Sequence, residues 1–330
     1  MAAPRLRADG SLDPVTGPDG RGDGDGWVTC DLGHRHWGIY GAAGLLLHRP
    51  TATGDGDEVL LQHRATWSHH GGTWGLLGGA RHSDESAVDA ALREAAEEGG
   101  LSPDGVQVHG RYDDAHGGWS YATALAAADA STEARPTGGE SIDVAWVPVD
   151  RLDGGEAAGG PPLHPGFAAS WPILRDALHP LTVVVDGANV VGSRPDGWWR
   201  DRAGAARRLI GACGSLPRDG LAGDELPEGL GAARLTRSWP QVVVVVEGAA
   251  RGVGDEDAPP GVTVAVATGS GDDEVVAAAQ RAARDGDPVR RRAEVLVVTA
   301  DRGLRDRVTP LGAVCVGPRW LTGLTSRPSP

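Results

Sequence analysis

The sequence of 330 residues contains no lysine, one methionine, one phenylalanine and three cysteines. Cys30, Cys213 and Cys315 are far apart and odd in number, which argues against a disulfide framework. No uninterrupted apolar run approaches the roughly 20 residues that a membrane helix needs. No apolar segment follows Arg5 and Arg7, as it would in a signal peptide. We therefore expect a soluble, cytoplasmic protein without a membrane partner.

Positive charge is scarce in the first half of the chain. Residues 1–180 hold 12 arginines against 26 aspartates and glutamates, whereas residues 181–330 hold 19 of each. The first part is therefore poorly suited to non-specific binding of phosphate backbones, while the second part permits RNA as a partner. The arginine clusters of the second part, at residues 290–292 and at residues 302, 305 and 307, are more typical of a solvated face.

The pattern of apolar residues changes near residue 179, and the chain length also suggests two domains. Residues 1–25 are rich in Gly, Pro and Asp and are expected to be a disordered tail. Residues 26–178 mix short strands, a Gly-rich loop and helices, whereas residues 179–325 alternate apolar runs with helix-like segments. Such an alternation predicts a Rossmann-like parallel α/β sheet, so the chain as a whole is predicted to be α/β.

Apolar runs and turn residues predict the individual elements. In the first part, strands are expected over residues 38–49, 58–64, 106–114, 120–127 and 144–150, and helices over residues 85–99 and 167–178. In the second part, strands are expected over residues 181–191, 241–250, 262–268, 293–301 and 312–317, and helices over residues 201–212, 272–285 and 302–309. The helix over residues 85–99 is expected to be capped by Ser83 or Asp84 and to end at Gly99 and Gly100.

Three glutamates, Glu94, Glu97 and Glu98, lie at positions i, i+3 and i+4 of this helix and so share one face; we call them the box glutamates. Like charges at this spacing repel one another, and such a face is tolerated when hard cations neutralise it. Mg²⁺ prefers oxygen ligands, and two such ions can clamp a pyrophosphate and activate water. Gly79 allows a backbone carbonyl to approach the same ion. The pattern predicts a divalent-metal site.

The other faces of this helix have separate roles. Arg93 is expected to point off the acidic face and to tether the preceding loop through Glu85. An apolar face, made of Ala87, Ala91, Leu92 and Ala95, is expected to pack on the sheet.

Residues 79–101 resemble the Nudix box, the signature of the Nudix hydrolases. The pattern is Gly, five residues, Glu, seven residues, Arg-Glu, an apolar residue, any residue, Glu-Glu, any residue, Gly and an apolar residue. At Ala95 the family usually has a bulkier apolar residue, which bears on packing rather than on chemistry. The matching residues are Gly79, Glu85, Arg93, Glu94, Glu97, Glu98 and Gly100.

The resemblance extends over about residues 35–178 and implies an α/β/α sandwich around a mixed sheet. It implies that the box glutamates, with the Gly79 carbonyl, hold Mg²⁺ or Mn²⁺, and that Glu85, Arg93 and Gly100 are structural. A box glutamate, or a glutamate from another loop, is implied as general base. Glu140 is our candidate for that extra carboxylate.

The implied reaction cleaves a nucleoside diphosphate linked to another moiety. The sequence leaves the substrate open among a nucleoside triphosphate, an oxidised one, a nucleotide sugar, ADP-ribose and a dinucleotide. Trp67 and Trp74 flank the Gly-rich loop and either stack on a base or belong to the core. His63, His69 and His70 either contact phosphate or cover the loop.

Acidic residues also end the strands predicted in the second part, and in an open parallel sheet ligands bind beyond those ends. This region, about residues 181–320, resembles the PIN-like nucleases, in particular their NYN branch, in the segments DGANVV, GDDEVV and TADRGLRDRV. Aspartates at such positions are also common helix caps and turn residues. The resemblance implies Asp186, Asp272 and Asp301 as metal ligands, with Asn189, Glu247 and Asp273 assisting.

Two alternatives therefore stay open for the second part. It is either an RNA-cleaving nuclease that provides the main function, with the Nudix-like part sensing a nucleotide, or an inactive binding module. The Gly-rich segment TGSGDD lacks the lysine of a phosphate-binding P-loop.

Cys30, His34 and His36 have a spacing that suits Zn²⁺. A structural zinc site usually needs four ligands, and the sequence shows no fourth. Packing and hydrogen bonding are therefore the preferred interpretation of these three residues.

Overall fold

The computed structural model describes residues 23–54, 56–102, 104–156, 159–195, 197–284 and 294–326. The predicted disordered tail lies outside the described residues except for residues 23–25, and the arginines at residues 290–292 lie outside them as well. No helix within the described part is long and apolar enough to cross a membrane. The chain divides into two compact units, made of Met1–Thr53, Asp57–Gln107 and Arg111–Pro172, and of Gly54–Gly56, Val108–Gly110 and Ile173–Pro330.

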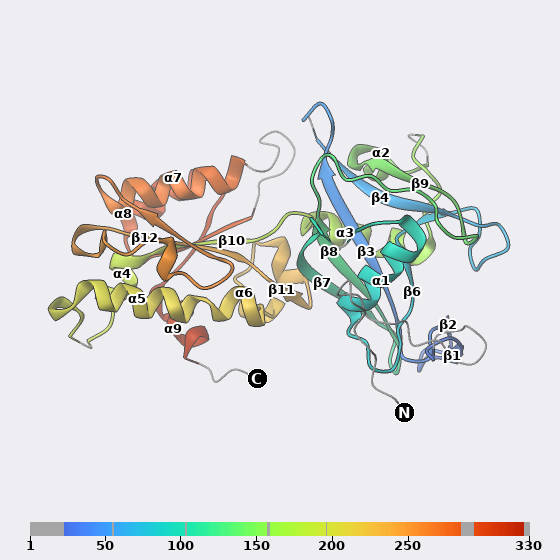
Figure 1. Ribbon diagram of the computed structural model, residues 1–330, viewed down its shortest axis with the longest axis horizontal. Coiled ribbons are helices and arrows are strands. Elements are labelled where there is room, and N and C mark those ends of the chain that lie inside the picture. Colours follow the sequence, from blue (N-terminus) through green and yellow to red (C-terminus); the bar gives the residue numbers. More distant parts are fainter. Residues whose placement is uncertain are drawn as a thin grey trace. The chain divides into compact units, whose positions relative to one another are not determined.

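The first unit is built on a mixed β-sheet (Figure 1). Its strands are β3 (Ala42–Pro50), β4 (Asp57–Arg64), β5 (Trp74–Gly75), β6 (Leu77–Ala80), β7 (Gln107–Ala115), β8 (Ser120–Ala127) and β9 (Ser141–Pro148). β3 pairs in parallel with β8 and antiparallel with β4 and β6, and β4 pairs antiparallel with β9. The predicted strands are thus found, although the first begins at Ala42 rather than at residue 38. The sheet confirms the predicted α/β class and its mixed pairing.

A small hairpin precedes this sheet, and two helices follow it in sequence. The hairpin pairs β1 (Trp27–Thr29) antiparallel with β2 (Arg35–Trp37), and it was not predicted. The helices are α2 (Val149–Asp153) and α3 (Pro165–Asp176).

The helix α1 (Ala87–Gly99) packs on β3, β6 and β8 through a face of small residues. Its N-cap is Ser86, whose hydroxyl accepts the backbone N–H of Asp89 at 3.1 Å. The predicted caps, Ser83 and Asp84, are wrong, because Ser83 lies outside the helix and binds Asp23 instead. At the other end Gly100 adopts the left-handed conformation, with φ 63°, and donates its N–H to the Ala96 carbonyl, as its residue type predicts.

The second unit contains a parallel sheet with strand order β13-β12-β10-β14-β15. The strands are β10 (Thr182–Asp186), β12 (Gln241–Val246), β13 (Val262–Val266), β14 (Val295–Val298) and β15 (Val314–Val316). Alternate residues of β10 enter different clusters: Val183 and Val185 face one side of the sheet and Val184 faces the other. The predicted Rossmann-like sheet, apolar on both faces, is confirmed.

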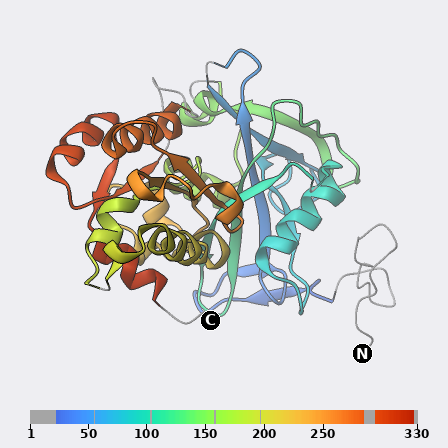
Figure 2. The same cartoon turned by 60° about the vertical axis from the view of Figure 1, so that its left-hand side comes forward.

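Helices cover both faces of this sheet (Figures 1 and 2). On one side lie α5 (Arg202–Cys213), α6 (Ser215–Asp219) and α9 (Pro318–Thr325), and on the other lie α7 (Gly271–Arg284) and α8 (Arg302–Val308). The strand predicted over residues 181–191 is too long, because β10 ends at Asp186 and the short helix α4 (Gly187–Gly192) begins directly after it. Helix α9 was not predicted.

Candidate active site

The turn from β6 into α1 brings the two glycines of β6 against the box glutamates. A Cβ on Gly79 would lie 2.6 Å from Oε1 and 2.8 Å from Oε2 of Glu94, so the Glu94 carboxylate would have to move. The neighbouring Gly78 donates its N–H to Oε2 of Glu98 at 2.9 Å. Glycine at residue 79 therefore leaves room for the Glu94 carboxylate in the position where Arg93 holds it. This reason differs from the one expected from the sequence, which was the approach of the Gly79 carbonyl to an ion.

Arg93 connects the loop to the acidic face, using all five of its N–H donors. Its guanidinium donates to both carboxylate oxygens of Glu85, at 2.8 and 3.0 Å, and to the Ala80 carbonyl at 2.9 Å. It also donates to Oε1 of Glu94 at 2.8 Å and to Oε2 of Glu97 at 3.1 Å. The expected tether to Glu85 is present. The expectation that Arg93 points off the acidic face is wrong, because one of its nitrogens reaches two box glutamates.

A buried glutamine on β4 holds the third box glutamate. Gln62, which is 0% exposed, donates from Nε2 to Oε2 of Glu98 at 3.0 Å and to the Leu76 carbonyl at 2.9 Å. Its Oε1 accepts the hydroxyl of Ser141, on β9, at 2.7 Å. These bonds fix the orientation of the amide, so that a donor rather than an acceptor faces the carboxylate. Sequence reasoning missed both Gln62 and Ser141.

Burial sets the protonation of the box. It raises the pKa of Glu94 to about 7, against the lowering effect of Arg93. It raises the pKa of Glu98 to about 8, and the neighbouring charge of Glu94 adds to this effect. Burial acts in the same direction on Glu85, but the hydrogen bonds from Arg93 and from the His82 N–H outweigh it and lower the pKa of Glu85. Two box glutamates are thus poised to release protons near neutral pH when positive charge approaches.

Each box glutamate keeps one oxygen free of hydrogen bonds to the described residues. Donors occupy Oε1 of Glu94, Oε2 of Glu97 and Oε2 of Glu98, which leaves the other oxygen of each carboxylate available. An all-oxygen set on one helix face is the donor chemistry that Mg²⁺ and Mn²⁺ prefer. The residues present therefore fit a hard divalent cation.

We expect Gln62→Leu to lower kcat/KM by about tenfold or more, because Glu98 loses a donor that sets its orientation. The substitution also leaves the Leu76 carbonyl and the Ser141 hydroxyl unpaired in the core, at a cost of about 1–3 kcal/mol in the free energy of unfolding. Steady-state kinetics at varied Mg²⁺ and urea unfolding measure the two effects. Gln107→Leu, at an exposed position on β7, is the matched control. Equal kinetics for the two variants would contradict a positioning role for Gln62.

Further polar groups surround Glu98. Glu140 lies close enough to raise the pKa of Glu98 by its charge, and Arg64 close enough to lower it. The hydroxyl of Tyr121 packs against Gly44 and Gly78, since a Cβ on either glycine would collide with it. Sequence reasoning missed Arg64 and Tyr121. Glu140 stays a prediction as the extra carboxylate.

The two tryptophans beside the Gly-rich loop differ from each other. Trp67 is 70% exposed, so it does not belong to the core. Trp74 stacks on His63, with ring centroids 5.0 Å apart and planes 6° apart. His69, His70 and His164 form a separate group, in which one ring nitrogen of each lies within 4.8 Å of the others.

The second unit brings several predicted acidic residues to the carboxyl edge of its sheet, where two of them cap helices. Asp186 caps α4, because its Oδ1 accepts the N–H of Asn189 at 3.0 Å, while its Oδ2 accepts the Thr299 hydroxyl at 2.9 Å. Asp301 caps α8 by accepting the N–H of Leu304 at 2.8 Å. Asp186 and Asp301 thus both act as helix caps. Asp186 also makes a buried hydrogen bond with Thr299, which capping alone does not require.

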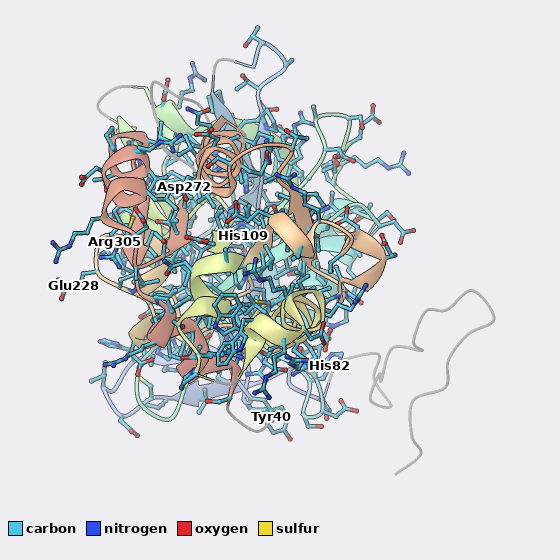
Figure 3. The ribbon with its side chains drawn as sticks, turned by 90° about the vertical axis from the view of Figure 1, so that its left-hand side faces the viewer. Tyr40, His82, His109, Glu228, Asp272 and Arg305 are labelled. Carbon is cyan, nitrogen blue, oxygen red and sulfur yellow. The ribbon has the colours of Figure 1, made fainter. Side chains whose placement is uncertain are left out.

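The remaining acidic residues lie around α7. Glu247 accepts a backbone N–H at the start of this helix at 2.7 Å, and Asp272 lies in its first turn (Figure 3). Burial raises the pKa of Asp186, and the charges of Asp272 and Glu247 raise it further. Asp273 instead pairs with Arg307 at 2.6 Å. Asp273 is therefore engaged with α8, which weakens the prediction that it assists at the sheet edge.

The comparison with known proteins decides the family of the first unit. A family model described as NUDIX domain matches residues 42–169. A protein of Mycobacterium tuberculosis named "Putative 8-oxo-dGTP diphosphatase 3" is 46% identical over 181 residues, which cover 52% of this chain and 78% of that protein. The chain belongs to the Nudix family. The prediction of a Nudix hydrolase acting on acid anhydrides is confirmed.

Two further relatives of this Nudix hydrolase match a smaller share of this chain. A "Nucleoside triphosphate pyrophosphatase/Nudix hydrolase fusion protein" of Bifidobacterium longum is 44% identical over 130 residues, which cover 38% of this chain and 27% of that protein. A crystal structure of the M. smegmatis Nudix hydrolase RenU is 45% identical and covers 46% of this chain and 94% of that chain, with a TM-score of 0.41.

Proposed function

We propose that residues 26–178 form a Mg²⁺- or Mn²⁺-dependent hydrolase of nucleoside triphosphates, with oxidised guanine nucleotides as its first candidates. The observation that carries this proposal is the trio of free carboxylate oxygens on α1, each held in place through the other oxygen of the same side chain. The name of the M. tuberculosis relative supports the choice of substrate.

The reaction is attack of water on phosphorus with cleavage of a phosphoanhydride P–O bond. Divalent ions, when bound, stabilise negative charge on the phosphate oxygens and acidify the attacking water. Glu98 or Glu140 takes the proton of that water. The two carboxylates are neighbours, because the charge of Glu140 raises the pKa of Glu98. Arg64, whose charge acts on Glu98, supplies a cation for a phosphate oxygen. Trp67, exposed beside the Gly-rich loop, offers a face on which a base can stack.

Hydrolysis of a nucleotide panel, with chromatographic identification of the products, tests this function. The panel contains dGTP, 8-oxo-dGTP, ADP-ribose, a nucleotide sugar and a dinucleoside polyphosphate, each with Mg²⁺ or Mn²⁺. We expect 8-oxo-dGTP to give the monophosphate with the highest kcat/KM. No hydrolysis of any of them would reject the function, and preference for ADP-ribose would keep the hydrolase but reject the substrate.

A second candidate function concerns residues 179–325, for which we propose a PIN-like, NYN-type domain that cleaves RNA, with Asp186, Asp272 and Asp301 as metal ligands. The gathering of acidic side chains favours this function over capping alone, because Asp272 and Glu247 lie near enough for their charges to raise the pKa of Asp186. In this alternative the Nudix unit senses a nucleotide.

Asparagine is as good an N-cap as aspartate, so Asp186→Asn and Asp301→Asn remove charge and keep the caps. We expect wild type to cleave single-stranded RNA in Mn²⁺ and both variants to lose cleavage. Asp201→Asn, at the cap of α5, is the matched control. Absence of cleavage by wild type would reject the nuclease and leave a binding module.

A further inference from the structure

Four metal-ligating side chains converge at the hairpin that precedes the Nudix sheet. Cys30 and His34 lie between β1 and β2, His36 lies on β2, and His116 lies in the turn between β7 and β8. One ligand atom from each of the four lies within 4.8 Å of all the others. His116 is the fourth ligand that the sequence did not show, because it follows His36 by 80 residues.

Two ring nitrogens in this group, Nε2 of His36 and Nδ1 of His116, are shielded from solvent and have no hydrogen-bond partner among the described residues. Burying an unpaired polar atom is costly, and such atoms are rare without an ion or water. The other nitrogen of the His116 ring contacts Oδ2 of Asp114 at 3.2 Å. A carboxylate behind a histidine in this way fixes the tautomer, so that the opposite nitrogen presents a lone pair. That nitrogen is the unpartnered Nδ1.

The backbone around Cys30 forms a tight turn that aims the thiol inward. The Cys30 N–H donates to the His34 carbonyl at 3.0 Å, and the Gly33 N–H donates to the Cys30 carbonyl at 2.9 Å. Gly33 has φ 81°, which a residue with a side chain rarely adopts. Cys30 is 5% exposed and forms no disulfide. Trp119 covers the group from one side by stacking on His36, with ring centroids 3.9 Å apart.

We propose that Cys30, His34, His36 and His116 bind one Zn²⁺ ion in a closed, tetrahedral site. One thiolate and three imidazoles form a donor set that suits zinc and does not suit magnesium, which needs oxygen ligands. Zinc bonds of about 2.0–2.3 Å place tetrahedral donors roughly 3.3–3.6 Å apart, so ligand atoms that lie within 4.8 Å of one another approach by up to about 1.5 Å on binding. Four protein ligands leave no position for a reacting water, so the ion is structural.

The proposed ion links the hairpin to the turn between β7 and β8. The residues after the hairpin lead into β3, whose first residue, Ala42, pairs with Ala80 at the end of β6. Gly38 accepts the indole N–H of Trp119 at 2.9 Å and lies against Ala80, and the Gly41 carbonyl accepts the N–H of Arg81 at 3.1 Å. Ala80 is the residue whose carbonyl binds Arg93. Zinc therefore stabilises the backbone that holds Ala80 and Arg81 in place, and it takes no part in the hydrolysis.

The test uses the full-length chain, purified with zinc in the medium, dialysed and analysed by elemental mass spectrometry. We expect about one zinc per chain in wild type, falling to less than about one tenth in Cys30→Ser and in His116→Gln. Two matched controls keep their zinc: Cys315→Ser changes another thiol, and His164→Ala breaks the second histidine group of the unit. Circular dichroism checks that each variant is folded.

Cobalt titration of the chelator-stripped wild type needs no variant, so misfolding of a mutant cannot hide the result. We expect a thiolate-to-cobalt charge-transfer band together with the intense visible bands of tetrahedral Co²⁺, both removed by one equivalent of zinc. Substoichiometric zinc in wild type with no charge-transfer band would overturn the proposal. Zinc retained in Cys30→Ser but lost in His164→Ala would also overturn it, by moving the site to His69, His70 and His164.

Discussion

Glu98→Gln is expected to lower kcat by about 10²–10⁴-fold while the fold is retained. Glutamine has the shape of glutamate, so one side-chain oxygen can still accept the N–H of Gly78 and the amide of Gln62. The variant loses the carboxylate that takes a proton or binds a cation. We expect Glu97→Gln to show a loss of the same kind. Steady-state kinetics on the best substrate of the panel measure both.

Stability gives this variant a second, independent readout. The pKa of Glu98 is about 8 in the folded chain, against an ordinary value of 4.5, so the folded state holds a proton that the unfolded state has lost between these pH values. Wild type without metal therefore loses stability as pH rises through this window, and Glu98→Gln is spared the part of that loss that comes from Glu98, while the part from Glu94 remains. Urea unfolding in EDTA at pH 5 and pH 8.5 compares the two. Glu133→Gln, an exposed glutamate outside the box, is the control, and full turnover by Glu98→Gln would exclude the proposed role.

Arg93→Ala is expected to have the largest effect on stability, lowering the free energy of unfolding by about 3–5 kcal/mol. Its guanidinium is 19% exposed and the Glu85 carboxylate is 12% exposed, so removal of the arginine leaves carboxylates poorly solvated and unpaired. Activity should fall with it, because Glu94 and Glu97 lose the donor that orients them. Urea unfolding and kinetics at saturating Mg²⁺ separate the two losses.

Arg93→Lys should recover only a minor part of this stability, since an ammonium group cannot donate in the five directions that Arg93 uses. Arg281→Ala removes an arginine from α7 that is 59% exposed and pairs with Glu274, and we expect it to cost less than about 1 kcal/mol. If Arg93→Ala unfolds at the same urea concentration as Arg281→Ala, the loop does not depend on Arg93.

The spacing of the box residues was sufficient to predict the helix, its acidic face and the pairing of Arg93 with Glu85. The helix start was predicted three or two residues too early, because Ser83, Asp84 and Ser86 are all good caps. Only the folded chain shows that Ser86 meets the N–H of Asp89. The sequence contains several suitable N-cap residues, and contacts in the folded chain, such as that of Ser83 with Asp23, determine which one caps the helix.

Residues that support the site through strand pairing were beyond sequence reasoning. Gln62 and Ser141 are 79 residues apart and meet because β4 pairs with β9. His116 joins the cysteine and histidines of the hairpin across a similar distance in the chain. No periodicity in a single sequence encodes such encounters, since they depend on which strands become neighbours. Asp186 differs from these residues, because the sequence did single it out. An aspartate at the end of a strand, however, is as consistent with a helix cap as with a metal ligand.

The anchoring of one oxygen in every box carboxylate has a consequence for metal exchange. Because Arg93, Gly78 and Gln62 already select a rotamer for each glutamate, a cation meets a preorganised receptor and costs little side-chain entropy on entry. Empty and loaded forms should then superpose closely around α1, and crystals grown without metal should tolerate soaking with manganese and nucleotide without cracking.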